Sequence, residues 1–435
     1  MPGSWREAII SVIPKEGKDK QDCSSYRPIS VLNQDYRLFT AVLARRLERI
    51  LPGIIHMDQT GFIKGRQMHD NIRRTLHVMQ YVTQNKVEAA IVGLDAEKAF
   101  DSVGWAFLYK VLGKFCFSET FIKVIQALYD KPTARVKING SLSRSFTLGR
   151  GCRQGCSASP LLFAIFLEPL SCWIKQNDAI TGIDVGGGVQ KLALFADDLL
   201  VYLSSPNTSL PALMATLGEY GRMSGYKINV QKTQVITFFY DPSRAIRDDY
   251  NINWEATSIQ YLGVTLPREL DQLKSSNYEK LINRIKSDIS RWNLIPYTSI
   301  VQRVEVIKMN VLPRLLYLFH SLPVEVPDTD FKEWDKLISR YIWQGRRPRI
   351  RFKTLQLPKN RGGLALPCMK SYYQAAQIKT LLHIFDPSYS ARWKDIEAGT
   401  TIRVPIQAMI GDKNLGKHIK DGANPWFKVS GKYLV

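Results

Sequence analysis

Three aspartates lie where apolar, strand-forming stretches of the sequence end or turn. Residues 87–95 (VEAAIVGLD) end in Asp95, and residues 192–203 (LALFADDLLVYL) carry Asp197 and Asp198 at their middle. Carboxylates at strand ends are costly to bury unless a cation neutralises them, and divalent cations that prefer oxygen ligands do this well. Two such ions about 4 Å apart can activate an attacking hydroxyl and stabilise a leaving pyrophosphate. An isolated pair of aspartates is more often a turn or a helix cap, so the pattern alone defines only a candidate metal site.

The elements that would hold these aspartates can be predicted from the spacing of apolar residues. The segment 192–203 predicts a β-hairpin with the aspartate pair at or near its turn. Residues 40–50 place apolar side chains on one helical face and arginines on the other, and apolar spacings of three and four predict amphipathic helices over 278–292 and 331–342. The sequence therefore predicts a mixed α/β region to about residue 265 and a helical lobe after it, with no fold assigned after residue 395.

Composition restricts the class of protein. The 435 residues include 60 Lys and Arg against 39 Asp and Glu, a net charge of +21 that favours a polyanionic partner. With 45% hydrophobic and 11% aromatic residues the chain can form real cores, and its length suggests two or three domains. The most apolar run, 159–170, is interrupted by Glu168 and Pro169. No secretory signal and no CxxC pair are visible, so we expect an intracellular protein without membrane partners, disulfides or zinc.

At these aspartates the sequence resembles a known family, the reverse transcriptases of non-LTR retrotransposons of the LINE-1 type. The resemblance covers about nine-tenths of the chain and consists of ordered blocks, which together are far more specific than FADD alone. The blocks are IPKEGKDK (13–20), SYRPISVLN (25–33), DQTGFIKGRQ (58–67), LDAEKAFDSV (94–103), YDKPTARVKING (129–140), RQGCSASPLLF (153–163), LFADDLLVY (194–202), GYKINVQKT (225–233), YLGVTL (261–266), YIWQGRRPRIRF (341–352) and RGGLALP (361–367).

The resemblance implies an α+β fold, a right-hand polymerase with an antiparallel palm sheet plus helices, partial fingers and an α-helical thumb. The corresponding divisions are partial fingers over 1–85 and a palm with the remaining fingers elements over 86–265. A helical thumb over 266–345 and a basic post-thumb region of uncertain fold over 346–435 would follow.

The resemblance also implies roles for individual residues. Asp95, Asp197 and Asp198 would be the catalytic carboxylates and the ligands of two Mg²⁺ ions, for which Mn²⁺ can substitute. The residues that would contact the incoming dNTP are Arg27, Phe100 as a steric gate against a ribose 2′-OH, Gln154, Gly155, and Lys232 as the proton donor to pyrophosphate. Residues Tyr261, Leu262 and Gly263 would form the primer grip. Some of these residues also have a simpler interpretation. Phe100 can be an ordinary core residue, Lys232 a solvated surface lysine and residues 261–263 a plain strand end.

Basic residues suggest where nucleic acid binds. Residues 341–361 contain Arg346, Arg347, Arg349 and Arg351, interleaved with aromatic residues and without an acid, a composition suited to phosphate contacts and base stacking. A solvated loop is the alternative. A second basic cluster (Lys64, Arg66, Arg73 and Arg74) follows DQTGF, where the resemblance implies contact with the template.

The implied activity is RNA-directed DNA synthesis with an RNA template, a DNA primer and dNTPs, by a monomer acting in the nucleus or the cytoplasm. The sequence departs from the family pattern at Cys152 and at residues 157–158, where small residues replace small residues. Because the blocks begin within the fingers, we expect the polymerase part of a truncated element copy or a gene-model fragment, with an endonuclease domain upstream in the full element.

Two other hypotheses belong to different classes. A truncated remnant would bind nucleic acid through the basic surfaces without catalysing incorporation. A group II intron maturase or a viral RNA-dependent polymerase would also use paired aspartates, but the YRPIS, AEKAFD and YKINVQK blocks argue against both, and Phe100 argues against incorporation of ribonucleotides.

Overall fold

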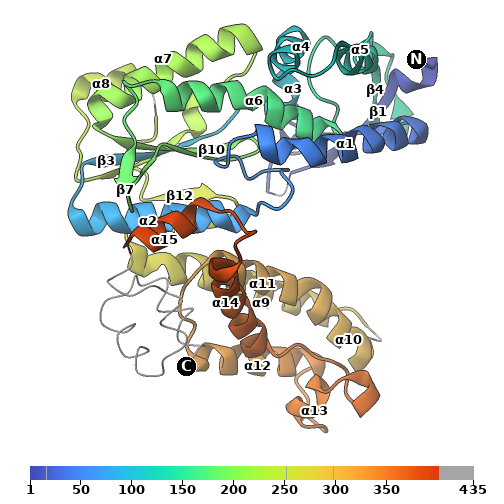
Figure 1. Ribbon diagram of the computed structural model, residues 1–435. Helices are drawn as coiled ribbons and strands as arrows, with labels where there is room; N and C mark the ends of the chain where they lie inside the picture. The colour runs from blue at the N-terminus through green and yellow to red at the C-terminus, as the bar shows by residue number, and fades with distance from the viewer. Residues whose placement is uncertain (16, 251, 297, 401–435) are drawn as a thin grey trace. The chain divides into compact units, whose positions relative to one another are not determined.

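The strand that precedes Asp95 is apolar on both faces, and it lies inside a helix-covered sheet. The computed structural model describes residues 1–400 except 16, 251 and 297. Strand β3 (Ala89–Leu94) is almost entirely buried because helices α6 (Ser159–Gln176) and α7 (Pro206–Ser224) lie over its sheet (Figure 1). A strand buried on both faces must be apolar throughout rather than alternating. The region after residue 400, part of the stretch for which the sequence predicts no fold, lies outside the described residues.

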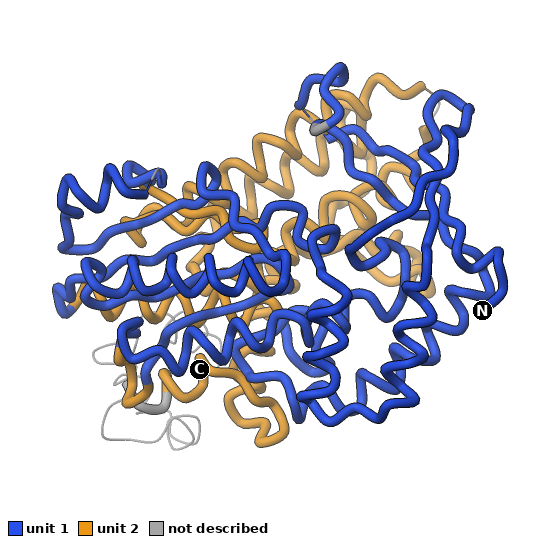
Figure 2. Tube along the Cα trace, turned by 90° about the horizontal axis from the view of Figure 1, so that it is seen from above, with its two compact units in different colours: residues 1–67, 85–183, 189–256 blue, residues 68–84, 184–188, 257–435 orange. Residues whose placement is uncertain are grey.

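Contacts within the chain define two compact units, drawn in two colours in Figure 2. Unit 1 comprises residues 1–67, 85–183 and 189–256, and unit 2 comprises residues 68–84, 184–188 and 257–435. The boundaries of the two units differ from those of the predicted subdomains, because residues 68–84 belong to the same unit as the segment after residue 257. The predicted change to a helical lobe at about residue 265 falls close to the start of the last segment of unit 2, and the finer division into fingers, palm and thumb stays a prediction.

Unit 1 contains the sheet that carries the three aspartates. Its strand order is β11–β3–β10–β9, antiparallel throughout, with β9 at Leu192–Phe195, β10 at Asp198–Ser204 and β11 at Gln234–Phe238. The predicted strand at 87–95 and the predicted hairpin at 192–203 are therefore confirmed.

A second sheet of unit 1 is formed mainly by the N-terminal residues. Strand β1 (Glu7–Pro14) pairs antiparallel with β2 (Tyr26–Leu32) and parallel with β4 (Thr133–Ile138). The short strands β5 (Ser141–Leu142) and β6 (Phe146–Thr147) both pair with β4, and β7 (Ile183–Val185) pairs with β8 (Gly188–Gln190) in a separate hairpin.

Helices complete unit 1 around one core. The helix predicted over 40–50 lies within α1, Gln34–Ile54, whose Asn33 side chain accepts a hydrogen bond from Asp35 N as an N-cap. Twelve of the 18 residues of α6 are buried, which is typical of a central helix. The other helices are α3 (Ala99–Ser102), α4 (Trp105–Lys114), α5 (Glu119–Leu128) and α8 (Arg244–Asp249), with 3₁₀ turns η1 (Gly3–Trp5), η2 (Cys23–Ser25) and η3 (Val230–Lys232).

The described residues of unit 2 are mainly helical, apart from the hairpin of β12 (Ser258–Tyr261) and β13 (Val264–Pro267) and residues 184–188, the middle of the β7–β8 hairpin. The predicted amphipathic helices are confirmed as α9 (Lys280–Asn293) and α12 (Asp328–Ile342), and Tyr278, Phe319 and Trp334 stack in its core. Its other helices are α2 (Met68–Asn85), α10 (Ile300–Val306), α11 (Leu312–Ser321), α13 (Phe352–Gln356), α14 (Met369–Phe385) and α15 (Arg392–Thr400), with short turns η4 (Leu270–Gln272), η5 (Ser275–Glu279), η6 (Ile307–Val311) and η7 (Lys359–Arg361). No helix in the described part of the chain has the length and apolar character needed to cross a membrane.

Candidate active site

The register of the central sheet brings the three aspartates to one edge. Leu94, the last residue of β3, pairs with Leu199 of β10, so the next residue along each antiparallel strand places Asp95 beside Asp198. Asp198 pairs with Phe195 across the β9–β10 turn, which contains Ala196 and Asp197. The sequence prediction that the acidic pair sits at a hairpin turn next to a second acidic strand end is therefore confirmed in geometry.

The three carboxylates influence one another electrostatically. Partial burial, together with the charges of Asp197 and Asp95, raises the pKa of Asp198 to about 6. Burial and the charge of Asp95 also raise the pKa of Asp197. Like charges held close together disfavour ionisation. The site therefore stores electrostatic repulsion that a bound cation would relieve.

A segment that crosses the end of β3 places Lys232 at this edge. Asn229 N donates to the main-chain carbonyl of Asp95 at 2.7 Å, and Glu97 N donates to Lys227 O at 2.8 Å. The η3 turn that follows brings Lys232 Nζ to 3.5 Å from Asp95 Oδ2, with both side chains substantially exposed. Lys232 thus belongs to the same cluster as the aspartates, as the sequence predicts.

The donor chemistry of the site suits a hard divalent cation, although the side chains do not form a closed cage. Within the described residues, no three His, Cys, Asp or Glu side chains converge closely enough to hold a metal ion as they stand. All three aspartates nevertheless offer carboxylate oxygens, the ligands that Mg²⁺ prefers. The raised pKa of Asp198 marks where positive charge would be most stabilising.

Phe100 lies in the loop and short helix that follow Asp95. Its ring is partly buried and stacks on Phe163 of α6, with ring centroids 4.4 Å apart and planes at 22°. The ring of Phe62 meets it edge to face at 6.3 Å and 81°. Phe100 O also accepts a hydrogen bond from Cys152 N at 2.7 Å, which ties this loop to the RQGC block.

The RQGC block also contacts the strand that carries Arg27. Gly155 has φ +100°, and a Cβ at this position would lie 2.5 Å from Ser30 O of β2, so only glycine fits. The close backbone approach at Gly155 is therefore to a strand of the protein itself. Arg27 is exposed on the same strand opposite Ile13, and Gln154 is half-buried.

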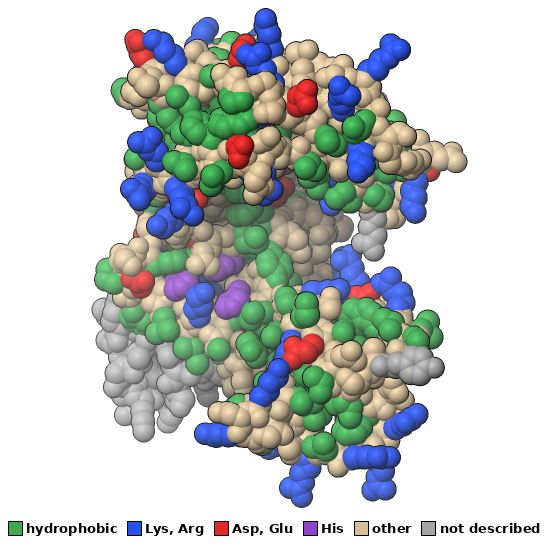
Figure 3. All heavy atoms as spheres, turned by 90° about the vertical axis from the view of Figure 1, so that its right-hand side faces the viewer, with side chains coloured by type: hydrophobic (Ala, Val, Ile, Leu, Met, Phe, Trp, Pro, Cys, Tyr) green, Lys and Arg blue, Asp and Glu red, His purple; other side chains and the backbone are tan. Residues whose placement is uncertain are grey.

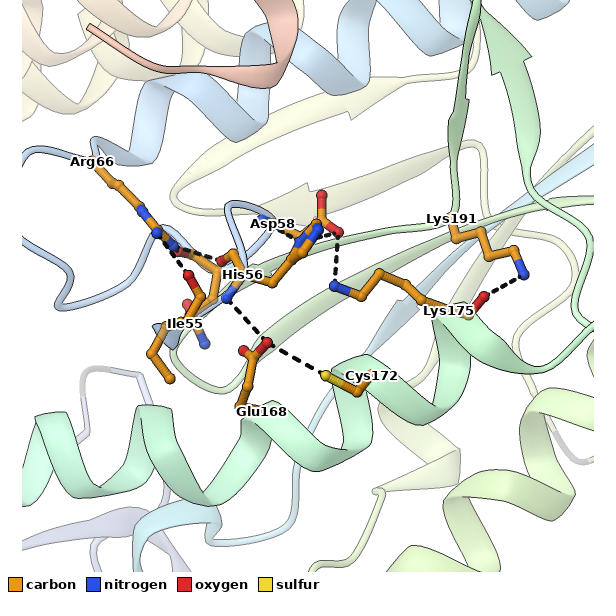
Figure 4. Close-up of polar contacts among 9 residues, drawn as sticks. Ile55, His56, Asp58, Arg66, Glu168, Cys172, Lys175 and Lys191 are labelled. Carbon is orange, nitrogen blue, oxygen red and sulfur yellow. Dashed lines mark hydrogen bonds and ion pairs between the residues drawn. The ribbon is translucent and has the colours of Figure 1, made fainter. Parts of the chain in front are cut away.

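Lys64 and Arg66 have different environments, although both follow DQTGF. Lys64 is exposed. The guanidinium of Arg66 donates to four main-chain carbonyls between residues 52 and 59, at 2.6–3.2 Å, and so satisfies the C-terminal end of α1 and the loop after it (Figure 4). Arg66 therefore has a structural role that the sequence prediction does not include.

Arg73 and Arg74 require a correction. The sequence assigns them to a basic nucleic-acid surface, but they are only 5% and 2% exposed within unit 2. Arg73 forms a buried ion pair with Glu397, with Nη2 2.6 Å from Oε1. The prediction is wrong because the acid that neutralises Arg73 lies more than 300 residues away in the sequence.

The remaining predicted residues belong to unit 2. Leu262 and Gly263 form the two-residue turn of the β12–β13 hairpin, with φ values of +50° and +75°. Tyr317 donates a hydrogen bond to Leu262 O, and Asn71 Nδ2 donates to Tyr261 Oη at 3.1 Å. The four arginines predicted to bind nucleic acid, Arg346, Arg347, Arg349 and Arg351, are all exposed between α12 and α13.

Two residues next to the aspartates are missed by the sequence reasoning. Burial and the charges of Asp197, Asp95 and Asp198 raise the pKa of Tyr226, whose buried phenol therefore stays protonated. Tyr226 lies in the GYKINVQKT block, and this position is the sequence signal that could have identified it. Gln59 Oε1 accepts a hydrogen bond from Ala196 N, in the catalytic turn, at 3.1 Å. Gln59 lies in the DQTGF block, but the sequence reasoning assigned a role only to the basic residues that follow this block.

Comparison with known proteins agrees with this geometry. Residues 13–266 match the family model described as reverse transcriptase (RNA-dependent DNA polymerase), which covers more than half of the chain. This match and the residues of the site place the chain in the reverse transcriptase family. Members of this family generally use divalent metal ions.

Similar proteins come from transposable elements. The chain is 27% identical over 403 residues to the transposon TX1 uncharacterized 149 kDa protein of Xenopus laevis, covering 90% of this chain and 30% of that protein. It is 26% identical over 400 residues to the Pol polyprotein of retrotransposable element R2DM of Drosophila melanogaster, covering 88% and 36%. The resemblance to non-LTR retrotransposon reverse transcriptases is therefore confirmed, and the chain spans about a third of the length of these relatives.

Among solved structures, apo telomerase from Candida tropicalis matches with a TM-score of 0.46 and 13% identity, over 90% of this chain and 69% of that chain.

Proposed function

We propose that this chain is the RNA-directed DNA polymerase of a LINE-type retrotransposon, which extends a DNA primer on an RNA template with dNTPs. The observation that carries the proposal is the meeting of Asp95, Asp197 and Asp198 at one edge of the β3–β10 sheet, where burial and mutual repulsion raise the pKa values of the last two. The family match supports the same activity.

In this proposal Asp95, Asp197 and Asp198 hold two Mg²⁺ ions, with Mn²⁺ as a possible substitute. When bound, such ions activate the primer hydroxyl and neutralise charge on the leaving pyrophosphate. Lys232, beside Asp95, would donate a proton to the pyrophosphate. The buried phenol of Tyr226 would stay protonated, because burial and the charges of the three carboxylates raise its pKa.

Other residues would bind the nucleotide and the nucleic acid. Arg27 has a free surface position and a forked guanidinium that can hold phosphate oxygens, and Gln154 and Gly155 lie in the loop packed on the same strand. Phe100 would exclude a 2′-OH by steric clash. The hairpin turn at 261–263 would grip the primer, and Lys64 with the exposed arginines of 346–351 would contact phosphates.

The wider context is also a proposal. A chain of this kind would act as a monomer in the nucleus or the cytoplasm, and the full element would add an endonuclease domain. The fingers, palm, thumb and post-thumb divisions at residues 1–85, 86–265, 266–345 and 346–435 belong to the same proposal.

Primer extension tests the assignment. The purified chain should extend a DNA primer on an RNA template with dNTPs and Mg²⁺, and Asp197→Asn should reduce the rate at least 1000-fold, roughly the effect of removing a group essential to transition-state stabilisation. Binding of the template–primer should change less than about threefold, because the substitution lowers negative charge at the site. Equal extension by the two proteins would show that the triad is misassigned.

A non-catalytic remnant makes the opposite prediction for the unmodified chain. It would bind RNA with an affinity that falls steeply with salt but would incorporate nothing at any Mg²⁺ or Mn²⁺ concentration. Matched reactions with rNTPs test for a ribonucleotide polymerase, which would incorporate them. A reverse transcriptase with a working gate at Phe100 should strongly prefer dNTPs, and a remnant should incorporate neither.

A further inference from the structure

Phe62 has an unusual backbone and an unusual exposure for a large aromatic residue. Its φ is +61°, in the left-handed region that bulky side chains rarely adopt, and 44% of its surface is exposed. Such a conformation persists only when the surrounding structure imposes it, and it is enriched at functional sites. The surroundings of Phe62 therefore need to be identified.

The segment 58–62 is held along the edge of β9, which leads into the catalytic turn. Leu194 N donates to Asp58 O at 2.9 Å, and Thr60 N donates to Leu194 O at 2.9 Å. These bonds extend the sheet by a short parallel bridge at Gln59 and Leu194. The segment that carries Phe62 therefore forms an additional edge of the catalytic sheet.

The side chain of Gln59 joins this segment directly to the catalytic turn. Its Oε1 accepts from Gly61 N at 2.8 Å and from Ala196 N at 3.1 Å, although the residue is only 1% exposed. At Gly61 a Cβ would lie 2.3 Å from Ala196 N, so the two backbones touch and no larger residue fits. Phe62, the next residue, is thereby fixed relative to Asp197.

Buried polar contacts anchor the start of the segment (Figure 4). His56 Nδ1 lies 2.9 Å from Asp58 Oδ2, and Lys175 of α6 lies 3.7 Å from the same oxygen. His56 N donates to Glu168 Oε1 of α6 at 3.0 Å. The contacts of residues 56–58 with α6 fix the start of the segment. The contacts of Gln59 and Gly61 with Ala196 fix its end, next to Phe62.

The ring of Phe62 meets the ring of Phe100 edge to face, and the ring of Phe163 stacks on the same Phe100 ring. The centroid distances are 6.3 Å to Phe62 and 4.4 Å to Phe163, both within the range of favourable aromatic pairs. Phe62 also contacts the ring of Phe195, the residue before the catalytic turn, at 6.4 Å. Phe100 therefore contacts two further aromatic rings, that of the buried Phe163 and that of the exposed Phe62.

We propose that Phe62 is a specificity-determining residue that acts through Phe100, by preventing its ring from turning away from an incoming ribose. The inference rests on the proposed function of Phe100 as the gate against a 2′-OH. A gate discriminates by steric clash only if its ring cannot move aside when a larger sugar enters. Phe163 supports that ring by stacking on it, and Phe62 supplies a second, edge-to-face support.

A purely structural role for Phe62 predicts different behaviour. With 44% of its surface exposed, the residue contributes limited apolar burial, and its loss would lower rates with dNTPs and rNTPs alike. Action through Phe100 instead changes the ratio of the two specificity constants. The ratio of kcat/KM for a dNTP to kcat/KM for the matching rNTP therefore distinguishes the roles.

The test is a double-mutant cycle on the full chain with Phe62→Ala, Phe100→Val and both together. Phe62→Ala should lower the dNTP/rNTP ratio about three- to tenfold, the effect expected of one aromatic pair. Phe100→Val should lower the ratio further, and adding Phe62→Ala to it should change nothing more, because the two residues act as one unit. Phe62→Leu, which keeps most of the volume without the ring, serves if the alanine variant does not fold.

Phe239 provides a matched control, because it is also an exposed phenylalanine of unit 1 with a positive φ, 47% exposed at +48°. Phe239→Ala should leave the ratio unchanged. If Phe62→Ala leaves the ratio unchanged while Phe100→Val lowers it, the inference fails and the gate stands. If the two effects simply multiply in the double variant, Phe62 does not act through Phe100. If Phe100→Val also leaves the ratio unchanged, the proposed gate itself is overturned.

Discussion

The two units contain acidic clusters that differ in how their charge is balanced. In unit 1, Asp197 and Asp198 lie beside Asp95, and repulsion adds to burial in raising the pKa values of both. In unit 2, Glu397 is 2% exposed but lies 2.6 Å from Arg73 and 2.8 Å from His77. Burial acts to raise the pKa of Glu397, but these partners outweigh it and the net pKa is lowered.

A second acid of unit 2 accepts hydrogen bonds from neutral side chains. Asp70 is 4% exposed, and its carboxylate accepts hydrogen bonds from Tyr389 Oη at 2.7 Å and from Trp393 Nε1 at 2.7 Å. Asp70, Arg73 and His77 follow one another along α2 at helical spacing, so one face of this helix binds α15 and the turn before it. Buried acids with cationic or hydrogen-bonding partners are typical of a structural network, whereas clustered acids left in mutual repulsion are typical of a site that awaits a cation.

The largest expected effect concerns the paired acid of unit 2, Glu397. Glu397→Ala leaves the buried guanidinium of Arg73 without its counter-ion, and breaking a buried pair in this way costs about 3–5 kcal/mol. We expect a clearly lower Tm at pH 7.5. Glu255→Ala, which removes an 84% exposed partner of Arg247, should cost less than about 1 kcal/mol. Equal losses from the two substitutions would contradict the assignment of Glu397 to a stabilising network.

The next prediction concerns pH, and it arises from histidines of unit 2. The ring of His69 lies 6.2 Å from His320 and 6.5 Å from His383, and histidine side chains gather on the face shown in Figure 3. Burial, the neighbouring histidines, Lys379 and Arg73 lower the pKa of His69 to about 3. The pKa values of His320 and His383 are also lowered, chiefly by burial, although Asp386 opposes the shift of His383.

A histidine whose pKa is lowered by folding binds fewer protons in the folded state than in the unfolded state. Its contribution to stability is therefore complete above the unfolded pKa of about 6.5 and is lost as the pH falls toward the folded value. Unfolding by urea should show a loss of about 1 kcal/mol for His69 between pH 6.5 and 5.5. His69→Phe, which keeps an aromatic ring but cannot titrate, should reduce this slope. An unchanged slope would exclude His69 as its source.

The turn that carries Asp197 and Asp198 can be predicted from sequence because its signal is local. Apolar residues on both sides of Asp197 and Asp198 specify the hairpin, and one further apolar strand that ends in Asp95 completes the pattern. The pairing of those two strands is not predicted from the sequence, and the register of the structure shows it.

The other residues of the two clusters depend on contacts that are distant in sequence. Arg73 has the same sequence signature as a surface arginine, and only the fold brings Glu397, 324 positions away, to its guanidinium. Gln59 likewise reaches Ala196 across 137 positions. Spacing rules describe neighbours along one helix or strand, so they give no information about such pairs.

The smallest expected effect concerns the acidic cluster of unit 1. The pH dependence of stability that Asp198 contributes has the opposite sign to that of the histidines. Asp198 binds its proton more tightly in the folded state, with a pKa of about 6, so its contribution favours unfolding above that pH and disappears as the pH falls toward 4. Asp198→Asn should therefore raise the Tm of the metal-free protein at pH 7.5. Because Asp198 is exposed, solvent screening limits the gain to less than about 1 kcal/mol.

Magnesium supplies the matching measurement. Mg²⁺ should raise the Tm of the unmodified chain by relieving the repulsion among Asp95, Asp197 and Asp198, and it should raise the Tm of Asp198→Asn less, since one ligand and one charge are gone. Glu48→Gln, which neutralises an exposed acid on α1, should show neither effect. If Asp198→Asn lowers the metal-free Tm, the acids of the catalytic turn are balanced like those around Arg73, and the distinction between the two clusters is lost.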